Sequence, residues 1–151
     1  MLVRPDLISV RLIRVLVLIL AIATVSSACG KKTPTTPSDP NLVITDLVIG
    51  TGLEATNLRT VAVNYTLWLY DASKPDGKGT QVQTSVGGSP FTFTLGNGQV
   101  IQGWDLGVPG MKVGGKRRLQ VPPNLAYGSS GAGSIPPNAT LVFEIDLLGV
   151  A

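Results

Sequence analysis

Alternation of apolar and polar residues is the feature of this chain that most limits its fold. Three segments, 61–69, 91–95 and 141–147, carry large apolar side chains at every second position. Successive side chains of a β-strand point to opposite faces, so this period predicts strands with one face on a core. Residues 118–121, which two prolines follow, are a weaker strand candidate.

One segment has a helical pattern instead, and it runs from Gln99 to Val108 before Pro109 and Gly110 end it. Its apolar residues would share one face of the helix: Val100, Ile101, Trp104 and Val108. One short helix among several strands predicts an α+β fold, in which a curved antiparallel β-sheet of five to six strands wraps around the helix. The chain has 151 residues and no internal repeat, so we expect a single folded domain at residues 42–151.

The first 28 residues are typical of a secretory signal peptide. Arginines at positions 4, 11 and 14 precede an apolar run at 15–25, and small residues then lead to Cys29. The run is shorter than the about 20 apolar residues that a membrane-spanning helix needs. Residues 26–29 resemble the lipobox of bacterial lipoproteins, with Ser26 in place of the usual leucine. We therefore expect a signal peptide over residues 1–28 and lipidation of Cys29; ordinary cleavage near Ala28, with Cys29 a free thiol, is the alternative.

A linker rich in threonine and proline follows the cysteine and completes the segment 29–41. Residues 30–41 contain no apolar side chain that could pack, which favours an extended, solvated tether of at most about 40 Å. Together with the lipid, the tether would hold the domain on a membrane in the periplasm. By resemblance to sorted lipoproteins, the lack of aspartate after Cys29 favours the outer membrane of a Gram-negative cell.

Composition excludes several kinds of chemistry. The chain has no histidine and one cysteine, which excludes Ser-His-Asp and Cys-His catalysis, histidine metal ligands and any internal disulfide. We expect no metal and no cofactor. From Leu42 to Ala151 seven basic residues balance seven acidic ones, so the basic excess of a nucleic-acid-binding domain is missing and we expect no such partner.

Four blocks of sequence carry a family resemblance. The segment Gly98–Gly128, GQVIQGWDLGVPGMKVGGKRRLQVPPNLAYG, resembles the centre of FKBP-type peptidyl-prolyl cis-trans isomerases. Ile135–Leu148, IPPNATLVFEIDLL, resembles the last loop and strand of that family, and the upstream blocks VAVNYT and SPFTFTLG have the matching order. The resemblance covers roughly residues 43–150 and implies the FKBP-like fold.

The resemblance also implies an apolar pocket that holds a prolyl ring between sheet and helix. Trp104 would form its floor, the N–H of Ile101 would bind a substrate carbonyl, and the Tyr127 hydroxyl would bind a second acceptor. Macrolide inhibitors of the family are expected to occupy the same pocket. The matching positions of this chain are Tyr65, Phe91, Val100, Ile101, Trp104, Tyr127, Ile135 and Phe143.

The sequence departs from the family pattern beside this pocket. Where members usually carry a Phe-Asp pair, the best match is Val82-Gln83, which makes that pocket wall uncertain. Residues 72–79 form a longer hairpin segment than is usual. The basic triplet at 116–118 could suggest an anionic partner, but we interpret it as a solvated strand edge.

Two functions fit these observations. The first is an isomerase that accelerates X–Pro isomerisation during folding of exported proteins, by binding a twisted prolyl amide non-covalently in the aromatic pocket. Such rotation breaks no covalent bond, so the lack of histidine is no obstacle. The alternative is a catalytically weak module that holds prolyl segments, or a chaperone of the cell envelope. Proline-containing unfolded polypeptides would be the partners in both cases.

Overall fold

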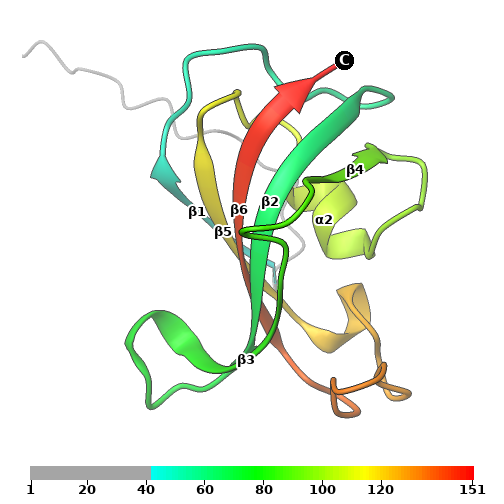
Figure 1. Ribbon diagram of the computed structural model, residues 1–151. Coiled ribbons are helices and arrows are strands. Elements are labelled where there is room, and N and C mark those ends of the chain that lie inside the picture. Colours follow the sequence, from blue (N-terminus) through cyan, green and yellow to red (C-terminus); the bar gives the residue numbers. More distant parts are fainter. Residues whose placement is uncertain (1–41) are drawn as a thin grey trace, which may run out of the picture. The chain divides into compact units, whose positions relative to one another are not determined.

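Six strands form one antiparallel sheet within residues 42–151, the part of the chain that the computed structural model describes (Figure 1). The expected signal peptide, Cys29 and the linker lie outside these residues. The sheet order is β1-β5-β6-β2-β3, and β4 also pairs with β2. The helical elements are α2 (Gln102–Gly107) and the short 3₁₀ turns η1 (Pro75–Gly77) and η2 (Pro123–Leu125). The strands are β1 (Val43–Val48), β2 (Thr60–Tyr70), β3 (Lys78–Thr84), β4 (Phe91–Thr94), β5 (Lys116–Val121) and β6 (Leu141–Val150).

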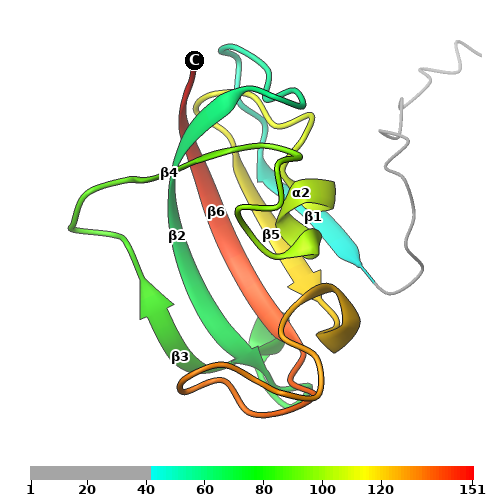
Figure 2. The ribbon, with the colours of Figure 1, turned by 90° about the vertical axis from the view of Figure 1, so that its right-hand side faces the viewer.

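Strand β2 organises one side of the sheet. One of its edges pairs along nearly its whole length with β6. The other edge is shared, because residues 60–63 pair with β4 and residues 66–70 pair with β3. The sheet curves around α2, which lies against its concave face (Figure 2). The predicted α+β fold, a curved antiparallel sheet around one short helix, is confirmed.

Alternation correctly located three strands, and most of the side chains that it assigned to the core face are buried. Tyr65 and Leu69 are only half-buried, and Phe91 is exposed. The helix is shorter than predicted, because Gln99, Val100 and Ile101 precede it and Ile101 has an extended backbone at its N-cap. Strands β1 and β3 were not among the segments that alternation indicated. The fully buried large side chains of the concave core include Val61, Val63, Leu95, Val108, Leu119, Val121, Leu141 and Ile145.

Two glycines bring α2 unusually close to the sheet. A Cβ atom on Gly103 would lie 2.4 Å from Val121 Cγ1, and one on Gly107 would lie 2.7 Å from both Leu119 Cδ atoms. Positions four apart lie on one face of a helix, so these glycines form the surface that faces β5. The helix can therefore rest directly on the side chains of β5.

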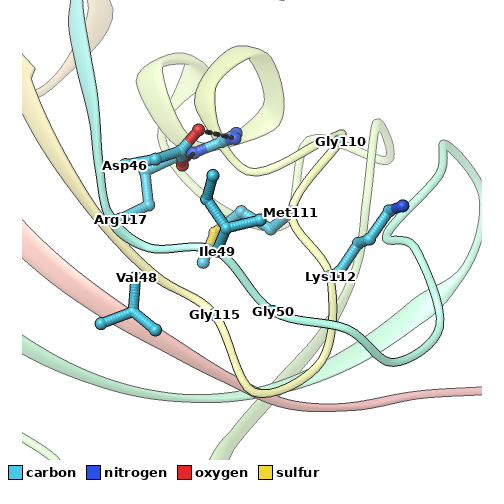
Figure 3. A pocket seen from close by; sticks show the side chains of 9 residues that line it. All are labelled: Asp46, Val48, Ile49, Gly50, Gly110, Met111, Lys112, Gly115 and Arg117. Carbon is cyan, nitrogen blue, oxygen red and sulfur yellow. Dashed lines mark hydrogen bonds and ion pairs between the residues drawn. The ribbon is translucent and has the colours of Figure 1, made fainter.

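A buried arginine fixes the same helix from its C-terminal end. Arg117 of β5 is 5% exposed and donates to both carboxylate oxygens of Asp46 on β1, at 2.6 and 3.2 Å. Its Nη1 donates to the carbonyls of Gly107 and Pro109, at 2.8 and 3.0 Å. Figure 3 shows this ion pair in a small hollow beside Ile49 and Met111. The guanidinium thus joins two strands to the C-terminal end of α2 and to the turn that follows it.

The interpretation of residues 116–118 as a solvated strand edge is wrong. Strand β5 lies between β1 and β6, so it is not an edge, and Arg117 points into the core side of the sheet. Arg118 lies on the convex face, where it binds Asp76 at 2.8 Å and Glu144 at 3.1 Å. The sequence could not show these partners, because they come from distant segments.

The long hairpin between β2 and β3 folds over this convex face. Asp76 in η1 pairs with Arg118, and Lys78 pairs with Glu144 while its Nζ lies 5.0 Å from the centroid of the Trp68 ring. Burial alone would raise the pKa of Glu144, but hydrogen bonds from Lys78 and Arg118 outweigh it and leave the pKa below its ordinary value. The residues that lengthen the hairpin therefore attach it to β5 and β6.

We predict that Gly107→Ala destabilises the domain by about 1–3 kcal/mol, because the methyl group overpacks against Leu119. Alanine gains about 1 kcal/mol of helix propensity over glycine, and the clash must exceed that gain. Urea unfolding would measure the free-energy difference. The control is Gly149→Ala, whose new methyl would meet only Ala62 at 3.9 Å. Equal stability of the two variants would contradict the proposed contact.

Candidate functional site

A cavity of ≈ 150 Å³ opens on the concave face between the sheet, α2 and the loop after η2. Within residues 42–151 it gathers aromatic and aliphatic side chains with three kinds of polar group, namely phenol, indole and carboxamide. Its lining consists of Tyr65, Leu67, Gln83, Phe91, Gln99, Val100, Ile101, Trp104, Tyr127 and Phe143.

Burial separates the floor of this cavity from its rim. Leu67, Trp104 and Phe143 are at most 4% exposed and form the floor. Phe91 and Tyr127 are each 39% exposed, and Gln83 and Gln99 are also exposed, so these four form the rim. The walls between floor and rim are half-buried: Tyr65, Val100 and Ile101.

An aromatic cluster centred on Trp104 joins the floor of the cavity to its wall and rim. The rings of Tyr65 and Phe143 meet it edge-on, with centroids at 5.2 and 5.3 Å and interplanar angles of 82° and 83°. Phe93 lies at 5.4 Å and Phe91 at 6.1 Å. These separations are typical of favourable aromatic contacts. The cluster presents a rigid, apolar surface to whatever enters the cavity.

Polar groups in the cavity are few and carry no charge at neutral pH. Burial, and to a smaller extent the neighbouring Tyr127, raises the pKa of Tyr65, so its phenol stays protonated. The indole N–H of Trp104 is buried and has no hydrogen-bond partner within the described residues. The backbone N–H of Ile101, just before α2, likewise donates to no backbone carbonyl of residues 42–151.

Side chains hold the segment that leads from β4 into α2. Asp105 of α2 accepts the N–H of Gly96 at 2.9 Å and the N–H of Gly98 at 3.1 Å. Gln99 reaches back and accepts the N–H of Thr94 at 2.8 Å. Hydrogen bonds to an ionised carboxylate are stronger than neutral ones. The wall formed by Val100 and Ile101 is thus positioned from both of its ends.

The structure brings together seven of the eight residues that the resemblance assigned to the pocket. The eighth, Ile135, is 8% exposed and packs in the core cluster without lining the cavity. At the uncertain wall, Gln83 lines the cavity, whereas Val82 packs partly buried against the core.

Two lining residues, Leu67 and Gln99, were not expected. Leu67 could have been found from the alternation of side chains, since it stands two positions after Tyr65 and so lies on the same face of β2. Gln99 was assigned to the helix, and no sequence signal separated it from that element.

The described residues contain neither a cluster of metal ligands nor a membrane-spanning helix. No group of three histidine, cysteine, aspartate or glutamate side chains in residues 42–151 is arranged to hold a metal ion. In the same residues, no helix is long and apolar enough to cross a membrane.

Comparison with known proteins gives a consistent result. The family model described as FKBP-type peptidyl-prolyl cis-trans isomerase matches residues 52–148. The FK506-binding protein of Neisseria meningitidis serogroup A is 49% identical over 111 residues, which are 73% of this chain and 96% of that protein. Peptidyl-prolyl cis-trans isomerase FKBP15-3 of Arabidopsis thaliana is 43% identical over 117 residues, covering 76% of this chain and 78% of that protein.

Solved structures agree with this comparison. The crystal structure of AtFKBP13 is similar with a TM-score of 0.65 and 39% identity, over 77% of this chain and 98% of that one. The crystal structure of FkpA from Escherichia coli gives a TM-score of 0.62 and 41% identity, over 75% of this chain and 49% of that one.

We predict that Asp105→Asn loosens the turn before the cavity wall. Asparagine keeps one acceptor oxygen and turns an N–H₂ group toward a backbone donor, so at least one of the two hydrogen bonds is lost. Amide hydrogen exchange at Gly96 or Gly98 should become about tenfold faster, as expected for a loss of about 1.4 kcal/mol. Asp146→Asn on the convex face is the control. Unchanged protection at both glycines would show that Asp105 does not hold the turn.

Proposed function

The chain belongs to the FKBP-type peptidyl-prolyl cis-trans isomerases and is an enzyme of that class, and we propose that its aromatic cavity holds the prolyl ring while the X–Pro bond rotates. The observation that carries this assignment of the site is the cluster around Trp104, with the rings of Tyr65, Phe91, Phe93 and Phe143 within 6.1 Å of it. A saturated five-membered ring has no hydrogen-bonding group of its own, so an apolar floor suits it.

Catalysis requires only that the cavity favour the twisted amide over the planar one. Rotation of an X–Pro bond has a barrier of about 20 kcal/mol because twisting breaks amide resonance. The twisted amide has less charge separation than the planar one, so an environment poor in water disfavours the planar form more. A thousandfold acceleration corresponds to about 4 kcal/mol of preferential binding. No proton or electron pair leaves the substrate, in keeping with an uncharged lining.

Two donors could orient the substrate over the floor. The N–H of Ile101 has no backbone acceptor in the described residues, which supports its proposed contact with a substrate carbonyl. The Tyr127 hydroxyl, on the exposed rim, would bind a second carbonyl. Hydrogen bonds at both sides of the prolyl ring would fix the backbone while the amide between them turns.

FK506-type macrolides are ligands of this family, and we propose that they enter the same cavity. The relatives from Neisseria meningitidis are named for FK506 binding. The exposed rings of Phe91 and Tyr127 offer apolar surface beyond the floor for the part of a large ligand that the cavity cannot enclose. Binding of a macrolide would therefore compete with prolyl substrates.

The proposed setting is the cell envelope, with exported, proline-containing polypeptides as substrates. Support comes from the basic and apolar leader at 1–28, from Cys29 at its end and from the linker at 30–41. A diacylated cysteine would attach the enzyme to the periplasmic face of a membrane, the outer one in a Gram-negative cell. The linker would then let the domain meet unfolded chains as they are exported.

We predict that Tyr127→Phe lowers kcat/KM for a Xaa-Pro peptide about two- to tenfold, as expected for one lost neutral hydrogen bond. Tyr127 lies on the rim and is 39% exposed, so the free energy of unfolding should change by less than about 0.5 kcal/mol. A protease-free isomerisation assay with the purified protein measures turnover. Tyr70→Phe is the matched control, because Tyr70 is 41% exposed and does not line the cavity. Equal turnover of the two variants would remove Tyr127 from the site.

We predict that Cys29→Ser moves the protein from the membrane fraction to the soluble fraction of the cell that produces it. The lipid on Cys29 would attach the protein to the membrane, and serine cannot carry the thioether. Incorporation of labelled fatty acid, followed by fractionation, measures both consequences. Fatty-acid label on the Cys29→Ser protein, or its absence from the wild type, would contradict the lipoprotein assignment. Neither result would bear on the assignment of isomerase activity.

A further inference from the structure

We propose that this enzyme selects prolyl substrates by shape and backbone contacts without discriminating by charge, because its rim presents two carboxamides, Gln83 and Gln99, and no ionised group. Acidic and basic residues next to proline would be accepted alike. This inference rests on the proposed position of the prolyl ring in the cavity. It assigns specificity to Gln83, which the family resemblance gave only as an uncertain pocket wall, and to Gln99, which the resemblance did not mark as a contact.

The residues beside proline must cross the rim. When the prolyl ring lies on Trp104, the chain on either side leaves the cavity between the four exposed lining residues, Gln83, Phe91, Gln99 and Tyr127. Neither these four residues nor the deeper lining includes an aspartate, glutamate, lysine or arginine. A charged substrate side chain therefore meets neither an opposite charge nor a like one there.

The two carboxamides can still bind a peptide backbone. Gln99 uses its Oε1 to accept the N–H of Thr94 at 2.8 Å, which leaves both protons of its Nε2 for a substrate carbonyl. Gln83 lies opposite Leu67 in the β2–β3 pairing, so its strand borders the floor. Among the described residues its carboxamide has no hydrogen-bond partner, and it can offer donors and an acceptor. Such groups recognise the main chain, which is the same for every substrate.

None of the charged residues of the described domain lines the cavity. On β5 and β6 the residues that alternate with the core point to the convex face, where Arg118 pairs with Glu144 and Lys116 with Asp146. The hairpin residues Asp76 and Lys78 join the same network. On α2, both oxygens of Asp105 accept backbone N–H groups. The charges that these elements carry are thus already paired or hydrogen-bonded.

The test compares three peptides that differ only before proline, Glu-Pro, Gln-Pro and Lys-Pro, at low ionic strength. For the wild type, kcat/KM for Glu-Pro and Lys-Pro should agree within about threefold. In Gln83→Glu, the kcat/KM for Glu-Pro divided by the kcat/KM for Lys-Pro should fall about tenfold. In Gln83→Lys this ratio should rise. A single charge at the rim is sufficient for such changes, and about 0.5 M salt should reduce them.

The matched control is Gln81→Glu, the same chemical change on the same strand. Gln81 pairs with Trp68 and does not line the cavity. The ratio of kcat/KM for Glu-Pro to that for Lys-Pro should therefore stay at the wild-type value in this variant. A wild-type preference above tenfold for either charge would overturn the proposal, as would equal ratios in Gln83→Glu and Gln81→Glu. Loss of the proposed function itself would look different, because wild-type enzyme would then fail to isomerise the neutral Gln-Pro peptide.

Discussion

The close approach of α2 to β5 determines the geometry of the whole site. Because Gly103 and Gly107 lack side chains, the helix rests on Val121 and Leu119, and the remaining space of the concave face lies on its other side. Trp104 points into that space and becomes the floor. Arg117 then fixes the C-terminal end of the helix to β5 and β1. A larger residue at either glycine would move the floor relative to the walls that the sheet supplies.

The two faces of the sheet divide the chemistry of the domain between them. The cavity on the concave face is aromatic and its lining contains no acidic or basic side chain, which suits a reaction in which charge separation decreases. The convex face carries the ion pairs of Arg118, Glu144, Lys116 and Asp146, and the long hairpin covers it. Ion pairs there stabilise the scaffold without placing a field at the reacting amide. Alternation along β5 and β6 is sufficient to keep the two environments apart.

The sequence predicted those elements whose pattern depends on burial alone. Strands β2, β4 and β6 alternate regularly and were located, whereas β1 was not, because Asp46 stands at an inward position where alternation requires an apolar residue. That position is explained only by Arg117, its partner 71 positions away. Strand β3 lies at the edge of the sheet and has a single apolar residue, Val82, so no alternation marks it. The family resemblance predicted most of the residues that line the cavity. It did not predict that Ile135 packs in the core, and the helical pattern did not predict that the helix begins only at Gln102. Such differences depend on local loop geometry, which no periodicity encodes.

The only two tryptophans of the chain lie on opposite faces of the sheet. Trp104 is buried in the cavity floor, while Trp68 is half-buried on the convex face under the ammonium group of Lys78. Their intrinsic fluorescence therefore comes from two unlike environments, one apolar and one beside a cation. With one indole replaced, emission from the other would report separately on occupancy of the cavity or on detachment of the hairpin. The fold thus contains two optical probes that need no label.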